Sequence, residues 1–113
     1  MDDKVHVSTH GDVTVVAMSG EVGAGKTESL RAELGRIADD DRSDVVLDFT
    51  GVTFVDATGV SVLVHALKRL SLAGRTLEVA VDDERAMRSL RLTGLSKLFV
   101  VHRSVAEALT SRR

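Results

Sequence analysis

The sequence predicts an α/β fold: a mixed, mainly parallel sheet of about five strands, four helices and an antiparallel strand at the N-terminal edge. Short segments rich in β-branched residues alternate with segments of helical periodicity along the 113 residues. Because strands that alternate with helices need crossover connections, most of the sheet is expected to be parallel. A Gly-Asp pair near the N-terminus predicts a hairpin, which supplies the antiparallel strand. No linker interrupts the pattern, so residues 1–113 are expected to form one domain.

The first third of the chain contains the predicted hairpin, followed by a helix. Val5 and Val7 alternate with polar neighbours, which is typical of a half-buried edge strand. A turn signal at residues 10–12 precedes a second strand at residues 13–18, which is rich in β-branched side chains. Residues 28–38 then place their apolar side chains on one face of a helix.

The middle of the chain repeats the order of strand and helix. Residues 45–47 form a short apolar run between two aspartates, which suits an interior parallel strand covered on both faces. Residues 49–55 are expected to form a connection, and residues 58–73 have the period of a helix that ends at Gly74. The buried stripe of this helix is expected to comprise Val60, Leu63, Val64, Leu67 and Leu70.

The last third is expected to add two strands and two helices. Residues 76–81 alternate like a strand, and residues 84–92 form a short helical segment. A last strand is expected at residues 98–101, and Ser104 is a suitable N-cap for a final helix at residues 104–109. The shorter helix is expected to send three apolar side chains into the core, those of Met87, Leu90 and Leu92.

Composition and charge argue against several classes of function. The chain has no Cys, Trp or Tyr, which excludes disulfides and cysteine chemistry and disfavours an aromatic platform for nucleic-acid bases. Fifteen Lys and Arg against seventeen Asp and Glu give a net charge of −2, so no nucleic-acid partner is expected. Four scattered His predict no metal site. The acidic N-terminus and the short apolar runs predict a cytoplasmic protein that does not insert into membranes.

Residues 20–27 match the phosphate-loop pattern G-x-x-x-x-G-K-[ST] and lie between a predicted strand and a predicted helix. In this interpretation nucleotide binding falls to Gly20, Gly25, Lys26 and Thr27. The lysine would contact the terminal phosphates and the threonine hydroxyl would hold Mg²⁺. A flexible lead into the first helix explains the same residues, and few residues follow to build the rest of a nucleotide hydrolase. Both interpretations stay open.

A second candidate site lies at the start of the central helix. Asp56 or Thr58 is positioned there to cap free N–H groups, and Gly59 allows another backbone to approach closely. The positive end of the helix dipole faces outward, and a phosphate on a hydroxyl here would add negative charge to a docking surface. A threonine that serves only as a cap explains the same pattern.

Four motifs resemble those of the STAS domains, a family named for sulfate transporters and anti-sigma factor antagonists. Residues 19–22 are similar to the family's G-E-[LIV] element, and residues 46–56 are similar to its next strand and lead-in. Residues 56–60, Asp-Ala-Thr-Gly-Val, resemble its D-S-[ST]-G-[LIV] motif, and residues 92–99 resemble its late turn. The resemblance extends over residues 5–109 and implies the STAS fold, that is, an anti-sigma antagonist-like fold.

The resemblance also implies a binding function with no catalytic centre and no cofactor. Antagonists of this family bind an anti-sigma factor, usually an ATP-binding serine kinase, and so release a sigma factor for transcription in bacteria. Their docking surface centres on the helix start after the D-S-[ST]-G motif, near the loop after G-E-[LIV]. The partner-binding residues that follow by position are Asp56, Ala57, Thr58, Gly59, Val60 and Gly23.

Two positions depart from the family pattern. The phosphoacceptor position holds Ala57, which has no hydroxyl, and Gly23 stands where an Asp is frequent. The first departure predicts that the usual phosphorylation switch is absent and the domain permanently active. The alternatives are that Thr58 takes the phosphate or that control has moved elsewhere.

Other partners stay open at this point. Stand-alone STAS domains also accompany ABC-type lipid transporters, and residues 62–65 resemble sequences of that group. The leading edge strand also offers backbone pairing with a second copy of the chain, which makes a homodimer possible.

Overall fold

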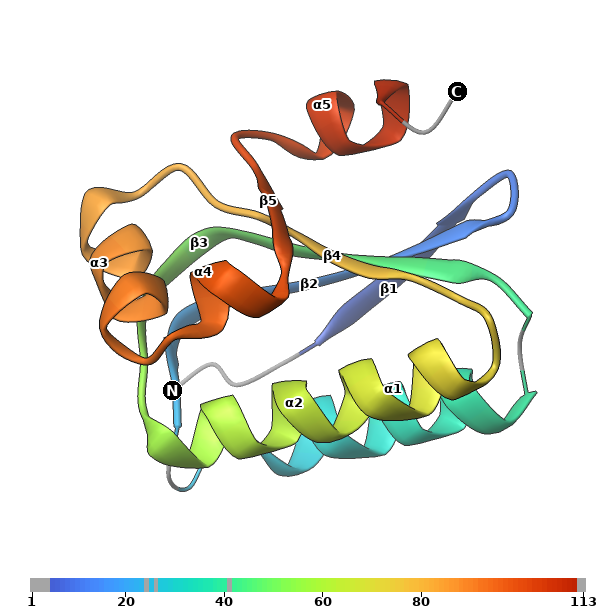
Figure 1. The fold of residues 1–113 in the computed structure, drawn as a ribbon, viewed down its shortest axis with the longest axis horizontal. Helices are drawn as coiled ribbons and strands as arrows, with labels where there is room; N and C mark the ends of the chain where they lie inside the picture. The colour runs from blue at the N-terminus through green and yellow to red at the C-terminus, as the bar shows by residue number, and fades with distance from the viewer. Residues whose placement is uncertain (1–4, 24, 26, 41, 112–113) are drawn as a thin grey trace.

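The computed structural model describes residues 5–23, 25, 27–40 and 42–111, which build one sheet and five helices (Figure 1). The strands are β1 (His6–His10), β2 (Val13–Val22), β3 (Asp44–Val55), β4 (Leu77–Ala80) and β5 (Val100–His102). The helices are α1 (Glu28–Asp40), α2 (Ala57–Leu72), α3 (Glu84–Leu92), α4 (Leu95–Leu98) and α5 (Val105–Thr110). The strand order is β1-β2-β3-β4-β5, with β1 antiparallel to β2 and all other neighbours parallel. This arrangement confirms the predicted mixed sheet.

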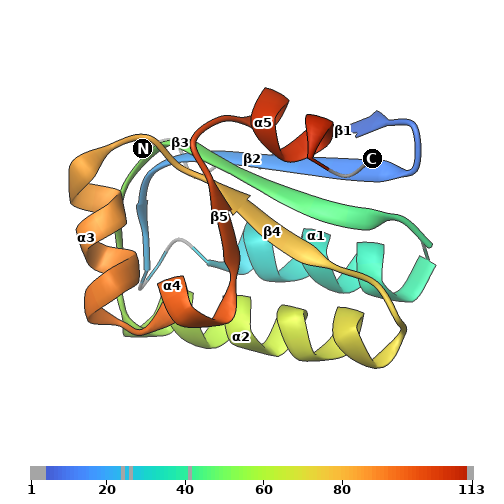
Figure 2. The same cartoon turned by 45° about the horizontal axis from the view of Figure 1, so that its top comes forward.

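The helices cover the sheet unequally. α1 and α2 lie side by side under one face, and the short α5 lies on the other (Figure 2). Val45, Val46 and Leu47 in the central strand β3 are all fully buried. Val45 and Leu47 belong to the main core with α1 and α2, whereas Val46 belongs to the smaller cluster under α5. The prediction of an interior strand covered on both faces is therefore confirmed.

The predicted hairpin is present and its strands are longer than expected. His10 pairs with Val13 across a two-residue turn, in which Gly11 has the positive φ of 66° that favours glycine. β2 does not end at residue 18 but continues to Val22, because its last residues pair with the far half of β3.

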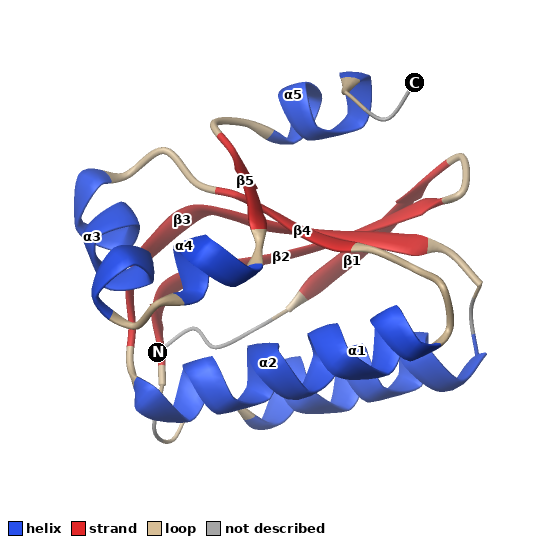
Figure 3. Ribbon diagram, viewed as in Figure 1, coloured by secondary structure: helices blue, strands red, loops and turns tan. Residues whose placement is uncertain are grey.

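The connection expected at residues 49–55 is wrong, because these residues continue β3. The pairing register with β2 shifts twice, between Ala17 and Ser19 and between Gly20 and Glu21, and each shift leaves one extra residue in β3. Such bulges bend a strand, and Figure 3 shows β2 and β3 bending together toward the start of α2. The bulges broke the alternation of apolar residues that marks a strand in the sequence.

The helices differ from the prediction in number and in one buried face. There are five helices in the described residues and not four, because Gly94, with φ of 82°, starts the separate short helix α4. The last strand consequently begins at Val100 and not at residue 98. The buried residues of α2 are Gly59, Val62, Leu63, Ala66 and Leu70. The stripe is rotated toward α1, so that Val60, Val64 and Leu67 are only half-buried.

The structure contains no helix among its described residues that is long and apolar enough to cross a bilayer.

Candidate partner-binding site

The start of α2 is exposed to solvent and is capped by an aspartate. Asp56 has extended backbone angles and its Oδ1 accepts the backbone N–H of Thr58 at 2.9 Å and that of Gly59 at 3.2 Å. These bonds satisfy two of the N–H groups that a helix start leaves without partners. Ala57 and Thr58 are exposed in the first turn. Of the two caps that the sequence allows, the structure uses Asp56.

The end of β2 packs directly against this helix start. The backbone N–H of Asp56 donates to the carbonyl oxygen of Val22 at 3.0 Å. A Cβ at Gly59 would lie 2.5 Å from the same carbonyl oxygen, so only glycine permits this approach. The ends of β2 and β3 therefore descend side by side to the first turn of α2 (Figure 1).

Gly23 is the other close contact of the site. It is buried, and a Cβ at this position would lie 2.2 Å from Oδ2 of Asp56. The carboxylate that caps α2 thus occupies the space that any side chain at residue 23 would need. The structure brings Gly23 together with residues 56–60, although more than thirty positions separate them in the sequence.

The predicted partner-binding residues differ in their exposure to solvent. Ala57 and Thr58 face solvent, Asp56 and Val60 are half-buried, and Gly59 and Gly23 are buried. Val60 also packs against the main core. Of these residues, those exposed to solvent therefore lie in the first turn of α2, and the remaining residues support that turn.

The residues of the phosphate-loop interpretation do not form one free loop. Gly20 lies inside β2 and pairs with Val52, and the side chain of Thr27 is buried. Gly25 has φ of 81°, and Lys26 lies outside the described residues. A phosphate loop needs consecutive free N–H groups around the anion. The first three residues of this motif, 20–22, are instead paired with β3 in the sheet.

A groove beside the site was not expected from the sequence. It has a volume of about 440 Å³ and lies between the bent ends of the strands and α3, with Phe54, Leu92 and Arg88 in its lining. Leu92 is 80% exposed and Phe54 is 48% exposed, so the expected role of Leu92 in the core is wrong. Leu90 is buried as predicted and Met87 is half-buried against the core. The sequence held one signal of this groove, the large apolar residue Phe54. In the structure Phe54 pairs in register with the exposed Glu21 near the end of β2.

One carboxylate near this groove is strongly perturbed. Asp83 caps the start of α3, and its pKa is lowered from 3.8 to about 2, chiefly by hydrogen bonds from the side chain of Arg85. The two side chains form an ion pair with Nη2 of Arg85 at 2.8 Å from Oδ2 of Asp83. The same contact raises the pKa of Arg85. In the part of the chain that the structure describes, no group of three His, Cys, Asp or Glu is placed to hold a metal ion.

A sequence profile of the STAS domain matches residues 4–108. This chain belongs to the STAS domain family. Over 111 residues it is 25% identical to the anti-sigma-F factor antagonist RsfB of Mycobacterium tuberculosis, an alignment that covers 96% of this chain and 88% of RsfB. Over 102 residues it is 28% identical to the anti-sigma-B factor antagonist of Staphylococcus epidermidis, with 90% and 94% covered.

The solved structure of a similar protein agrees with the fold. The crystal structure of an anti-sigma factor antagonist from Mycobacterium paratuberculosis superposes with a TM-score of 0.84 at 28% identity. The superposition covers 96% of this chain and 92% of that one. The STAS family and fold that the sequence motifs predicted are confirmed.

Proposed function

We propose that this chain is an anti-sigma factor antagonist, which binds an anti-sigma factor in the cytoplasm and thereby releases a sigma factor for transcription. The observation that carries the proposal is the match, over nearly the whole chain, with relatives and a solved structure that are named as such antagonists. The exposed and rigidly supported first turn of α2 supports the position of the docking surface.

The chemistry of this turn suits reversible contact with a protein surface. Ala57 and Thr58 are small and uncharged, so a partner can cover these two side chains without desolvating a charge on them. The close contacts of Gly23 and Gly59 keep the turn in one conformation, which reduces the entropy that binding must remove. The surface therefore resembles a preformed seat for a partner.

The partner in this proposal is an anti-sigma factor of the ATP-binding serine-kinase type. Position 57 has no hydroxyl to receive a phosphate, so the antagonist stays in its binding state in the presence of the kinase and Mg-ATP. Incubation of the chain with its partner and Mg-ATP, followed by mass spectrometry, is expected to find no phosphate. Phosphate found on Thr58 would contradict this expectation and would show that the phosphorylation switch has moved from position 57 to position 58.

The test of the function is binding to the anti-sigma factors encoded in the same genome, measured by calorimetry with the folded chain. Binding to at least one, together with release of its sigma factor in a transcription assay, is the expected result. Absence of binding to every one of them would end the proposal, and copurification with a transporter ATPase would redirect it.

A matched pair of variants tests the site. Ala57→Glu places a charge on the exposed first turn of α2 and is expected to weaken binding by about tenfold or more. Ala106→Glu places the same charge in the first turn of α5, on the opposite face of the sheet, and is expected to leave the affinity unchanged. Equal effects of both variants would contradict the position of the site.

Self-association through β1 stays a prediction. All five residues of this strand are exposed, and it forms an edge of the sheet. Sedimentation over a range of concentrations would show a dimer if this edge pairs with a second copy.

A further inference from the structure

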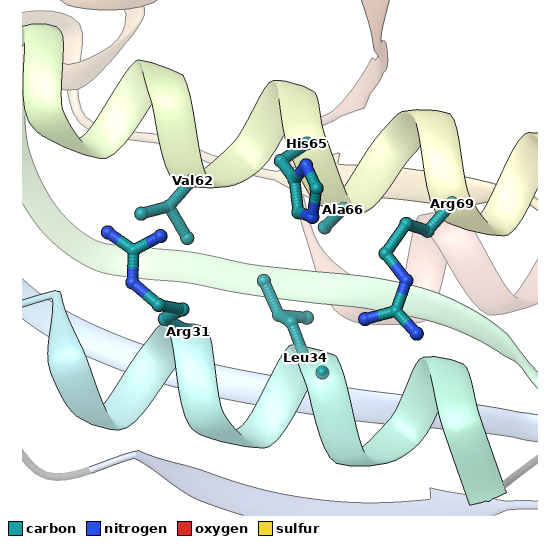
Figure 4. Close-up of a pocket in the computed structure, with 7 residues that line it drawn as sticks. Arg31, Leu34, Val62, His65, Ala66 and Arg69 are labelled. Carbon is teal, nitrogen blue, oxygen red and sulfur yellow. The ribbon is translucent and has the colours of Figure 1, made fainter.

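A groove lined by basic side chains lies between α1 and α2 (Figure 4). Its volume is about 170 Å³. The apolar side chains that line it, those of Leu34, Val62 and Ala66, are almost completely buried. Its polar side chains are basic: Figure 4 shows His65 and Arg69 reaching from α2 toward α1, with Arg31 of α1 opposite Val62.

The charge of this groove is opposite to that of the whole chain. The protein carries a net charge of −2, yet none of the residues that line the groove has a carboxylate. Arg69 forms an ion pair with Asp39 at one end of the groove. Arg31 makes no ion pair within the described residues and is exposed. The groove therefore attracts an acidic ligand most strongly at its Arg31 end.

The groove continues the docking surface of the proposed function. Val62 follows Thr58 by four residues, which is about one turn of helix and about 6 Å along its axis. A protein seated on the first turn of α2 therefore reaches the Arg31 end of the groove without a further change of direction. This continuity favours a segment of the same partner as the occupant.

The volume of the groove limits the size of the group that it can bind. A cavity of about 150 Å³ in another protein binds benzene, so a groove of this size accepts one large apolar side chain. Pockets that enclose whole metabolites are about 300 Å³ or larger. The shape thus suits a single anchoring side chain with charged neighbours and does not suit a nucleotide.

We propose that this groove binds an acidic segment of the anti-sigma factor. One Phe or Leu of that segment lies on the floor formed by Leu34, Val62 and Ala66. A carboxylate on one side of it pairs with Arg31, and a second lies near His65. This inference rests on the proposed function for the identity of the partner, whereas the chemistry of the groove is tested separately.

The groove is tested with a peptide probe and nuclear magnetic resonance. A short helical peptide with two Glu beside one Phe on the same face is titrated into the ¹⁵N-labelled chain. Amide shifts are expected to cluster on residues 31–35 and 62–69, and to weaken as salt is raised. A twin peptide with Lys in place of both Glu is expected to bind at least about fivefold more weakly. Shifts absent from these residues, or equal binding of the twins, would overturn the inference.

Three variants separate charge from shape. Arg31→Glu is expected to weaken binding of the acidic peptide by about fivefold or more. Lys68→Glu makes the same change on α2 outside the groove, and an unchanged affinity is expected. Gly35→Met fills the groove from α1, where a Cβ meets only Arg69 at 3.8 Å, and is expected to abolish peptide binding while the thermal melt shows an intact fold. Binding that survives Gly35→Met would contradict the assignment of the floor.

Failure of the function and failure of the groove give different results. If no anti-sigma factor binds the wild-type chain but the peptide shifts appear, the proposed function fails and the acidic groove stands. If an anti-sigma factor binds equally well to wild type, Arg31→Glu and Gly35→Met, the function stands and the groove has no part in it. Loss of that binding in both variants, with Lys68→Glu unaffected, supports both.

Discussion

The starts of α2 and α3 carry the same local device and differ in what surrounds it. In each, an aspartate precedes the helix and its Oδ1 accepts the N–H groups of the second and third helical residues. At α2 the distances from Asp56 are 2.9 and 3.2 Å, and at α3 the distances from Asp83 are 2.7 and 3.3 Å. By its cap alone, neither helix start is distinguished as a binding site.

Tertiary contacts make the difference. At α3, Arg85 folds back onto Asp83, with Nε at 3.1 Å and Nη2 at 2.8 Å, so the charge of the cap is neutralised within the helix. At α2 the equivalent second position is Thr58, which carries no charge, and the cap packs instead on Gly23 of another element. A cap is held rigidly only where a distant backbone packs against it, as Gly23 does at α2.

The largest expected effect comes from the third helical position. Gly59→Ala would place a Cβ 2.5 Å from the carbonyl oxygen of Val22, and no side-chain rotation relieves a clash between backbone-fixed atoms. α2 must then move away from β2, and we expect a loss of about 1–3 kcal/mol in the free energy of unfolding, measured with urea. The third position of α3 already holds a buried alanine, Ala86, so the demand for glycine is specific to α2. An unchanged urea midpoint would refute the close approach.

The next effect tests whether Gly23 and Asp56 act as one unit. Asp56→Ala removes the cap and is expected to destabilise the chain by about 0.5–2 kcal/mol. Gly23→Ala is expected to have a similar effect because its methyl group displaces the carboxylate from the cap. In the double variant Gly23→Ala should cost little beyond the loss already caused by Asp56→Ala. The expected coupling free energy between the two substitutions is about 1 kcal/mol. Additive losses in urea unfolding would show that the two residues act independently.

A smaller effect of opposite sign is expected in the middle of α1. A Cβ at Gly35 meets only Nη1 of Arg69 at an ordinary contact distance of 3.8 Å. Gly35→Ala therefore gains helix propensity without a clash, and we expect about 0.5–1 kcal/mol of added stability. Comparison with Gly59→Ala in the same urea experiment separates glycines that the fold requires from those that it tolerates. Destabilisation of both would remove that distinction.

The smallest effect concerns the pKa of Asp83. Arg85→Ala is expected to raise this pKa from about 2 toward 3.8, as measured by carbon NMR of the side-chain carboxyl. Because the pKa of Asp83 in the folded state is below its ordinary value, its contribution to stability is present above about pH 4. That contribution declines as the pH falls toward 2, and Arg85→Ala should remove most of this dependence. Arg88→Ala, further along α3, is expected to leave the pKa of Asp83 unchanged.

Local patterns predicted the elements better than they predicted the surfaces. The hairpin turn, the N-cap at Ser104 and the end of α2 before Gly74 depend on neighbouring residues, and all three were predicted correctly. The continuation of β3 through residues 49–55 was missed because bulges place two extra residues there and break the alternation. The exposure of Leu92 was missed because an apolar side chain at helical spacing does not reveal which face of α3 is covered.

The sequence by itself determined the alternating order of strands and helices, the hairpin and the STAS motif at residues 56–60, because these are properties of short segments. Only the tertiary structure decided that Gly23 supports the cap of α2 and that basic side chains line the groove between α1 and α2. It also decided that the buried stripe of α2 turns toward α1. Each of these features depends on the distance between residues that are far apart in the chain. The bend of β3 and the contact between α1 and α2 set these distances, and the periodicity of the sequence carries no information on either.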